Sequence, residues 1–421
     1  MPASRSREPD ETASPSTPPA RCPVSHGASQ RKSDRGAPPD APAIERRGDT
    51  WHLRSYAAVR QVLRDAESTR QAGFNAEMVD RTGLRQPVLF QDGPEHKEQR
   101  TAIARFFTPK TVGDVYRTLM EELSDELVAE LVRARRGDLS ELSLALAVQV
   151  AARVVGLTDS RVPGMARRLE AVLSLERLED LSRLRRGVAM LASQAHLLRF
   201  YLQDVRPAIA ARRKVPREDV ISHLLAKGYK DSEILIECIT YGAAGMATTR
   251  EFIGIAAWHL LDDESLRREF LAGDEDERHR ILHEILRLEP VVGHLYRRAT
   301  DDIVIEHGGE TTRIPAGSRI AMDVRAANAD PTAVGDEPLR VCPHRDLGAG
   351  VQPSVLSFGD GAHRCPGAFI AITESDVFLQ RLLRLPLEVT RSPRLEWNDL
   401  IESYEVRGFE VAVLPATPTT G

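Results

Sequence analysis

The stretch SFGDGAHRCPGAFI, residues 357–370, places one cysteine in a setting that could do chemistry. Gly359 and Gly361 allow backbone conformations that other residues rarely adopt, and the Pro-Gly pair after Cys365 favours a helix that starts directly behind the sulfur. Backbone N–H groups of such a loop and helix start favour negative charge, which stabilises a thiolate. One interpretation is a surface turn with an incidental thiol. The other is a thiolate that binds haem iron and donates electron density to it.

The same loop fills a longer pattern, F-G-x-G-x-H-x-C-x-G. Its fixed positions are Phe358, Gly359, Gly361, His363, Cys365 and Gly367. In this pattern the chain resembles the cytochrome P450 superfamily, in its soluble bacterial form. The resemblance extends over residues 46–421 and implies a haem b cofactor, iron protoporphyrin IX, whose iron is bound by Cys365.

A second motif, ILHEILRLEP, places Glu284 and Arg287 three residues apart on a predicted helix that ends before a proline. Taken alone, such a pair is usually a solvated ion pair that contributes ~0–1 kcal/mol. The resemblance implies a structural role, in which the pair and a later arginine lock the helix beneath the haem. The segment RVCPHRD supplies Arg345, although Val341 and Cys342 stand where an aromatic and an acidic residue are common.

Haem carries two propionates, which need cations or hydrogen-bond donors that a folded pocket holds still. By family position the resemblance assigns this role to His96, Arg100, Arg297 and His363. His96 and Arg100 are four residues apart and therefore share a helix face. Each residue taken singly is more simply a surface residue, and Arg298 is the one most easily confused with Arg297.

Residues 231–261 predict one long helix, roughly 45 Å at about 1.5 Å per residue. Its centre, AGMATT, resembles the oxygen-binding kink of the family, with matches at Ala244, Gly245, Thr248 and Thr249. A tightly packed core helix would also explain these small and β-branched residues. Ala247 stands where most relatives have Asp or Glu, so one member of the acid–alcohol pair that delivers protons to dioxygen is missing.

The resemblance also names residues that line the substrate pocket, most of them apolar: Tyr241, Ala244, Val291, Val292, Gly293 and Leu295. An apolar lining with few polar anchors favours a lipophilic small molecule. We therefore expect a small lipophilic substrate, of the kind made in secondary metabolism.

The elements that must position these residues are mostly helices. Residues 1–44 are rich in Pro, Ser and Arg with few large apolar side chains, so we expect them to be disordered. Apolar residues then recur at helical spacing, and the exceptions are a predicted hairpin near 301–322 and a final strand, GFEVAVLP. The predicted fold is mainly α with minor β, a single large domain over residues 45–421 with the cytochrome P450 fold.

Composition limits the classes of partner. The net charge of -5 comes from 57 basic and 62 acidic residues without a polybasic block, which argues against nucleic acid and anionic membranes. No segment approaches the ~20 apolar residues of a membrane span, and the start of the chain lacks a secretory signal. The four cysteines match neither a disulfide framework nor a zinc site. We expect a cytoplasmic protein, a monomer with reduced thiols.

The resemblance implies a monooxygenase that inserts one oxygen atom from dioxygen into its substrate. The chain has no flavin or iron–sulfur segment, so electrons must come from a separate ferredoxin or flavodoxin with its NAD(P)H reductase. We expect this carrier to dock near Cys365, on a basic surface made of Lys97, Arg100, Arg105, Lys110 and Arg364. Two alternatives remain: a haem enzyme that couples or desaturates without oxygen insertion, which Ala247 favours, and a non-catalytic haem sensor or carrier.

Overall fold

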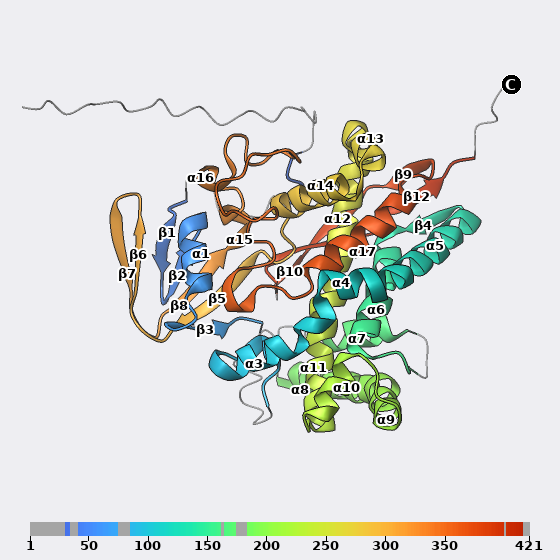
Figure 1. Cartoon of the computed structure of the whole chain (residues 1–421), viewed down its shortest axis with the longest axis horizontal. Helices are drawn as coiled ribbons and strands as arrows, with labels where there is room; N and C mark the ends of the chain where they lie inside the picture. The colour runs from blue at the N-terminus through green and yellow to red at the C-terminus, as the bar shows by residue number, and fades with distance from the viewer. Residues whose placement is uncertain are drawn as a thin grey trace, which may run out of the picture.

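Helices make up most of the described part of the chain, as the apolar periodicity predicts (Figure 1). The computed structural model describes residues 30–33, 41–74, 85–160, 164–173, 183–399 and 401–415. The longer helices are α1 (Tyr56–Arg64), α3 (Gly93–Ala104), α5 (Arg117–Ala134), α6 (Leu139–Val155), α7 (Met165–Leu173), α8 (Arg183–Phe200), α9 (Arg206–Lys214), α10 (Val220–Ala226), α13 (Glu264–Ala272), α14 (Glu275–Leu288) and α17 (Ala368–Leu382). Short turns of helix include η2 (Arg105–Phe107), α15 (Val324–Ala327) and α16 (Pro331–Val334).

The predicted long helix crosses the centre of the molecule in two parts (Figure 1). Helix α11 (Asp231–Gly242) runs into a π-helical turn, η6 (Ala243–Ala247), and continues as α12 (Thr248–Asp262). A π turn inserts an extra residue into the helix and is often found at a functional site. The kink predicted from AGMATT therefore coincides with this turn.

The described strands form four small sheets. Five strands pair in the order β1-β2-β8-β5-β3, and only β2 and β8 run parallel among these described strands. Their bounds are β1 (Ile44–Arg47), β2 (Thr50–Leu53), β3 (Thr69–Ala72), β5 (His294–Ala299) and β8 (Arg319–Asp323). The hairpin predicted near 301–322 is confirmed for β6 (Ile303–His307) with β7 (Glu310–Ile314), whereas residues 319–322 belong to β8 and pair with β2 and β5. The last strand is β12 (Glu410–Val413), which pairs with β4 (Arg136–Asp138) and β9 (Leu387–Arg391). Strands β10 (Arg394–Asn398) and β11 (Ser403–Arg407) form the fourth sheet.

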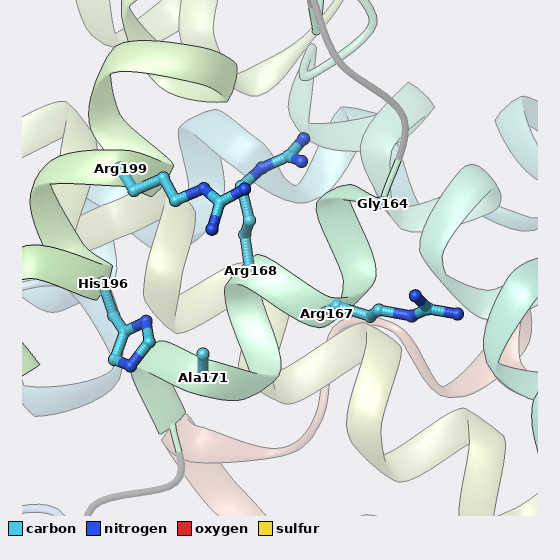
Figure 2. A pocket seen from close by; sticks show the side chains of 6 residues that line it. All are labelled: Gly164, Arg167, Arg168, Ala171, His196 and Arg199. Atoms are coloured by element: carbon cyan, nitrogen blue, oxygen red, sulfur yellow. The ribbon is translucent and has the colours of Figure 1, made fainter. Parts of the chain in front are cut away.

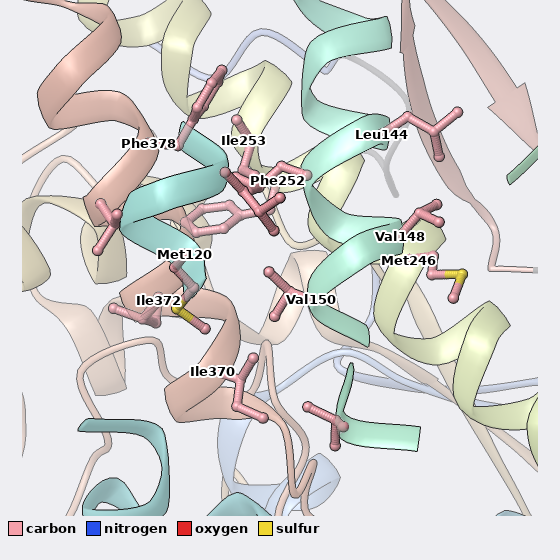
Figure 3. Close-up of a cluster of buried hydrophobic side chains, with 14 of the residues drawn as sticks. Met120, Leu144, Val148, Val150, Met246, Phe252, Ile253, Ile370, Ile372 and Phe378 are labelled. Atoms are coloured by element: carbon pink, nitrogen blue, oxygen red, sulfur yellow. The ribbon is translucent and has the colours of Figure 1, made fainter. Parts of the chain in front are cut away.

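The main core lies among the central helices. Figure 3 shows side chains from α5, α6, η6, α12 and α17 that converge on one another, including Met120, Val150, Met246, Phe252 and Phe378. A second buried cluster packs α1 against the five-stranded sheet. Deletion of one fully buried aromatic side chain such as Phe378 would cost about 3–5 kcal/mol, so this core fixes the long helix firmly.

Two stretches within the segment predicted to be disordered have a described structure. Arg31 donates from Nε to the Leu288 carbonyl (2.9 Å), and Ser33 donates from Oγ to the Glu289 carboxylate (2.5 Å). Residues 41–44 lead into β1. The structure differs from the prediction here because polar contacts, and not apolar side chains, hold residues 30–33. The rest of the predicted segment lies outside the described residues.

The cysteines also differ from the expectation of four reduced thiols. Cys238 and Cys365 are free, whereas Cys342 is disulfide-bonded. Cys22 lies outside the described residues.

The sequence analysis also found no segment long and apolar enough to span a membrane. Within the described ranges, no helix has the length and apolar character that a bilayer crossing needs.

Candidate functional site

The loop around Cys365 folds as its glycines and proline predict. The Cys365 N–H donates to the Phe358 carbonyl (2.8 Å), and α17 begins at Ala368. The backbone N–H groups of Gly367 and Ala368 are directed at the sulfur, which is the arrangement predicted for a thiolate. The Cys365 residue is accessible, but the surrounding protein desolvates its sulfur, and this effect outweighs the amides and raises the pKa of the thiol. A metal ion bound to the sulfur would favour the thiolate.

Gly361 fixes this loop against α1. Its φ of +66° lies in the left-handed region, and a Cβ atom at this position would lie 2.3 Å from the Leu63 carbonyl oxygen. The neighbouring Asp360 accepts from Arg60 (3.1 Å) and Arg64 (2.8 Å) on α1. The glycine pattern of the motif therefore has a packing reason, since a larger residue would push the loop away from the helix.

The structure brings the Glu284–Arg287 pair and Arg345 together. Arg287 donates to both Glu284 oxygens, at 2.7 Å from Nε and 2.8 Å from Nη2, and Arg345 Nε lies 3.3 Å from the same carboxylate. The Cys342 N–H also donates to Glu284 (2.8 Å). Both arginines donate further to carbonyls in residues 328–340. The three charges therefore join α14 to the segment that precedes the Cys365 loop.

Arg297 and Arg298 are separated by the alternation of strand β5. Arg297 is buried and Arg298 exposed. The Arg297 guanidinium donates to the Gln71 side-chain carbonyl and to the Tyr296 carbonyl (3.0 Å). Neither of these two hydrogen-bond partners is charged. Burial lowers the pKa of Arg297 to about 10. Arg297 is therefore a buried cation with uncharged hydrogen-bond partners, and the charge of the nearby Asp92 offsets only part of the effect of burial on its pKa.

Two histidines stack beside Arg297. The rings of His96 and His363 lie 4.1 Å apart with an interplanar angle of 15°. His363 Nε2 is 3.1 Å from Asp92 Oδ1, and burial lowers the pKa of His96 to about 4. Arg100, one turn after His96 on α3, donates to the Arg364 carbonyl in the Cys365 loop. The helix and the loop thus bring together donors that lie more than 260 residues apart in the sequence.

This donor set fits a haem group. Arg297 is a buried cation that forms no ion pair with the described residues, although the charge of Asp92 acts on it, and such a cation suits a propionate. The stacked histidines and Arg100 add further donors nearby. Two amide N–H groups directed at one cysteine sulfur match a thiolate ligand to iron. The residues that would hold the group are Cys365, Phe358, Gly359, Gly367, His96, Arg100, Arg297 and His363.

The two threonines that follow the π turn differ in exposure. Thr248 has a partly accessible side chain and donates from Oγ1 to the Ala244 carbonyl (2.5 Å), whereas Thr249 is buried. Ala244 and Ala247 are exposed on this stretch of helix. A Cβ atom on Gly245 would lie 3.3 Å from Ala151 of α6. Gly245 therefore allows close helix packing, and Thr248 is the hydroxyl on the accessible side.

Glu251 follows Thr248 by three residues, but its carboxylate forms hydrogen bonds with another element. Its carboxylate accepts from the Val406 N–H (2.5 Å) and from Arg407 (2.7 Å) on β11. The side chain is buried, and burial raises its pKa against the effect of Arg407. Glu251 therefore stabilises the contact of α12 with β11 and is not a free acid beside Thr248.

The predicted pocket residues fall into two groups. Tyr241 stacks on Phe107 of η2 (6.4 Å between ring centres), so its ring faces the α3 side of α11. Gly293 donates its N–H to the Ile401 carbonyl (3.0 Å), and a Cβ atom there would lie 2.1 Å from the Glu402 carbonyl oxygen. Val291 is buried and Val292 half-buried before it, and Leu295 packs toward Gly359. Residues 291–295 thus lie between the Cys365 loop and β11.

Three residues near the site were missed by the sequence analysis. Gln71 contacts Arg297, Asp92 contacts His363, and Glu237 lies on α11 one turn before Tyr241. The DGP sequence at 92–94 predicts a helix start, but Asp92 accepts from the Gln71 N–H (2.9 Å) and from His363 and does not cap α3. No pattern marks Gln71, because its role depends on pairing between strands β3 and β5.

Comparison with known proteins agrees with this geometry. The family model named Cytochrome P450 matches residues 279–388. Cytochrome P450 130 of Mycobacterium tuberculosis is 28% identical over 383 residues, 86% of this chain and 87% of that protein. The biotin biosynthesis cytochrome P450 of Bacillus subtilis is 27% identical over 80% of this chain and 83% of its own length. The erythromycin C-12 hydroxylase of Saccharopolyspora erythraea is 26% identical over 81% and 83%.

Solved structures share the fold. The crystal structure of CalO2 superimposes with a TM-score of 0.72 at 24% identity and covers 87% of this chain and 91% of its own. P450BioI, in complex with an acyl carrier protein ligated to hexadec-9Z-enoic acid, gives a TM-score of 0.70 at 23% identity and covers 86% and 92%. With the Cys365 loop, the paired Glu284 and Arg287, the kinked long helix and these relatives together, the chain belongs to the cytochrome P450 superfamily.

Proposed function

We propose that this P450 monooxygenase inserts one oxygen atom from dioxygen into a small lipophilic substrate of secondary metabolism. The observation that carries the proposal is that one loop holds both the Cys365 sulfur, with its two amide N–H groups, and His363, on which the charge of the buried Arg297 acts. Haem b, bound there, would supply the activation of dioxygen. Cys365 would bind the iron, and Arg297, His96, Arg100 and His363 would hold the propionates.

The residues of the long helix would control protons. Thr248 has the accessible hydroxyl, and a hydroxyl passes protons but does not readily originate them at neutral pH. Ala247 supplies no acid, and Glu251 is engaged with Arg407. Protons would therefore reach the site through Thr248 from ordered water or from a polar group of the substrate.

The substrate proposal draws on the relatives and on the predicted lining. One relative is named for hydroxylation of erythromycin, and another solved structure is of a hydroxylase involved in himastatin biosynthesis. Ala244, Val292 and Leu295 supply apolar surface near the Cys365 loop and the π turn. The acyl carrier protein bound to P450BioI adds carrier-bound lipids to the substrate classes worth testing.

A second candidate is a reaction without oxygen insertion, such as coupling or desaturation. Ala247 favours it, because a chain without an acid at this position has a weaker proton supply for oxygen insertion. In either case electrons would come one at a time from a ferredoxin or flavodoxin. Lys97, Arg105, Lys110 and Arg364 are exposed near the Cys365 loop and would attract an acidic carrier.

The test is substrate discovery followed by isotope analysis. The haem-loaded protein is titrated with a library of lipophilic natural products, and hits are found by the low-to-high-spin change of the haem spectrum. Turnover of a hit under ¹⁸O₂ should give a product that carries one labelled oxygen atom. A product that has lost two hydrogens and gained no label would establish the second candidate instead.

A further inference from the structure

Helix α8 exposes a stripe of apolar side chains. Val188, Leu191 and Leu198 are 62%, 69% and 56% exposed, and Leu202, in the turn that follows α8, is 42% exposed. With the exposed Ala195, these positions repeat at intervals of three and four residues. Such spacing is typical of a helix face that packs against another helix. An exposed apolar face of this kind usually marks a binding surface.

The stripe lies on the outer side of the layer that covers the π turn. A Cβ atom on Gly242 of α11 would lie 2.6 Å from Leu169 of α7, and Glu170 of α7 accepts from Arg250 of α12 (2.5 Å). Helix α7 therefore contacts the long helix on both sides of residues 243–247. Helix α8 packs on α7. Together α7 and α8 form a layer over the long helix, here called the roof, and the free face of α8 is the outer surface of that layer.

A basic cavity lies beside the stripe, between α7 and α8. Its volume is about 360 Å³, and Figure 2 shows its lining: Gly164, Arg167, Arg168, Ala171, His196 and Arg199. Arg168 is paired with Asp204, at 2.7 Å from both Nε and Nη2. Arg167 and Arg199 are exposed, and no carboxylate in the described ranges pairs with either. Two guanidinium groups with free donors are suited to a phosphate or a carboxylate.

Charge decides what kind of helix the stripe fits. Among the α8 residues whose side chains are described, Arg199 is basic and none is acidic, and Arg167 of α7 adds a second exposed cation. A second copy of this chain would place like charges opposite each other, which disfavours pairing. The stripe also has no Trp, Tyr or Phe, the residues that anchor helices in a membrane interface. An acidic helical protein fits both the apolar spacing and the charge.

We propose that the outer face of α7 and α8 is the docking surface for a small acidic carrier protein that presents the substrate on a phosphodiester-linked arm. The apolar stripe packs against a helix of the carrier, and the phosphate of the arm pairs with Arg167 and Arg199. This inference rests on the proposed function, because a lipophilic substrate is the cargo that needs a soluble carrier. It goes further in naming the surface that receives a carrier-bound substrate and the residues that hold the carrier and its arm.

The test uses the full-length, haem-loaded protein and isothermal titration calorimetry. The probe is a bacterial acyl carrier protein in its apo form, its phosphopantetheine form and its hexadecanoyl form. The two forms with a phosphodiester arm should bind at least tenfold more tightly than the apo form. The double variants Leu191→Ser/Leu198→Ser and Arg167→Glu/Arg199→Glu should each weaken binding by at least tenfold. The matched controls Val304→Ser and Arg268→Glu, at exposed sites on β6 and α13, should bind like the wild type.

Three outcomes would overturn the proposal. The first is that no carrier form binds, or that the Leu191→Ser/Leu198→Ser and Arg167→Glu/Arg199→Glu variants bind as well as the wild type. The protein used must show the thiolate spectrum in its reduced carbonyl complex. The proposed function would then stand without this docking surface. The second is that the wild type binds phosphatidylglycerol vesicles and not the carrier, and that Leu191→Ser/Leu198→Ser abolishes this vesicle binding. The third is concentration-dependent dimerisation in sedimentation analysis that the same variant abolishes.

Discussion

Arg297 illustrates how a single side chain indicates a missing partner. Its guanidinium is buried with uncharged hydrogen-bond partners, and burial lowers its pKa despite the nearby Asp92 charge, a cost that a bound anion would reduce. Family position alone could not separate it from Arg298, because the two are adjacent in the sequence. The strand separates them, since neighbouring residues of β5 point to opposite faces.

We predict that Arg297→Leu lowers haem retention and that Arg298→Leu does not. Loss of one partner of a buried ion pair typically costs about 3–5 kcal/mol, enough to leave apoprotein after purification. The measurement is the ratio of haem to protein in both variants and the wild type. Full haem content in Arg297→Leu would remove this residue from the propionate site.

Thr248 and Thr249 offer a matched pair for the proton question. We expect Thr248→Ala to increase peroxide release per electron consumed, because the accessible hydroxyl that orders protons would be lost. Thr249→Ala, at the buried neighbour, should leave the ratio unchanged. Equal ratios in the wild type and Thr248→Ala, measured with a known substrate, would show that this hydroxyl does not control protonation.

Ala247→Asp would restore the acid that most relatives have at this position. If the proton supply of the native enzyme is only weakened, product formed per electron should rise in this variant. If the substrate supplies the missing group, the new carboxylate should repel it and the yield should fall. An unchanged yield would mean that residue 247 has no part in proton delivery.

Helices and strands differ in how much of them could be predicted. The helices with strong periodicity, α1, α6 and α13, lie where their apolar residues predict, and the β6–β7 hairpin pairs as expected. The five-stranded sheet was not predicted, because β1, β2 and β3 are four-residue strands that depend on distant partners. The contact of Arg31 and Ser33 with the end of α14 was also missed, since isolated polar residues leave no periodic pattern.

Helix α17 also contains a buried acid that no motif indicates. Burial raises the pKa of Glu374 from 4.5 to about 8. Between these values the unfolded chain is ionised while the folded chain keeps the proton, so stability falls as the pH rises, by about 1.4 kcal/mol per unit. Glu374→Gln should reduce this slope, whereas the exposed Glu388→Gln should not.

The measurement is the free energy of urea unfolding of the wild type and both variants at pH 5.5 and pH 7.5. Glu237, with a pKa raised to about 7 by burial, contributes a slope of the same sign and stays in every variant. The comparison therefore concerns the difference between variants. A Glu374→Gln slope equal to that of the wild type would mean that Glu374 is ionised in the folded protein.

The molecule as a whole has two faces with different expected partners. The basic residues near the Cys365 loop form the surface for the expected electron carrier, whereas α7 and α8 cover the long helix around its π turn. The family motifs predicted the first face, because Arg364 and Cys365 belong to one motif and the family position of Arg100 places α3 beside it. The second depends on exposure of α8 side chains, which only the packed structure shows.

We predict that Lys97→Glu/Lys110→Glu slows electron transfer from an acidic ferredoxin by about tenfold at low salt, with a smaller effect at high salt. Lys214→Glu, an exposed site on α9, should have no effect. Stopped-flow reduction under carbon monoxide measures the rate. Equal rates for the wild type and the Lys97→Glu/Lys110→Glu variant at low salt would place the docking surface elsewhere.

The central claim is that Cys365 binds haem iron as a thiolate, and the reduced carbonyl complex tests it most directly. The wild type should show the strongly red-shifted Soret band of thiolate ligation, and Cys365→Ala should lose it. Cys238→Ala, at a free buried cysteine on α11, should keep the band. A red-shifted band that persists in Cys365→Ala, or its absence in haem-loaded wild type, would contradict the account.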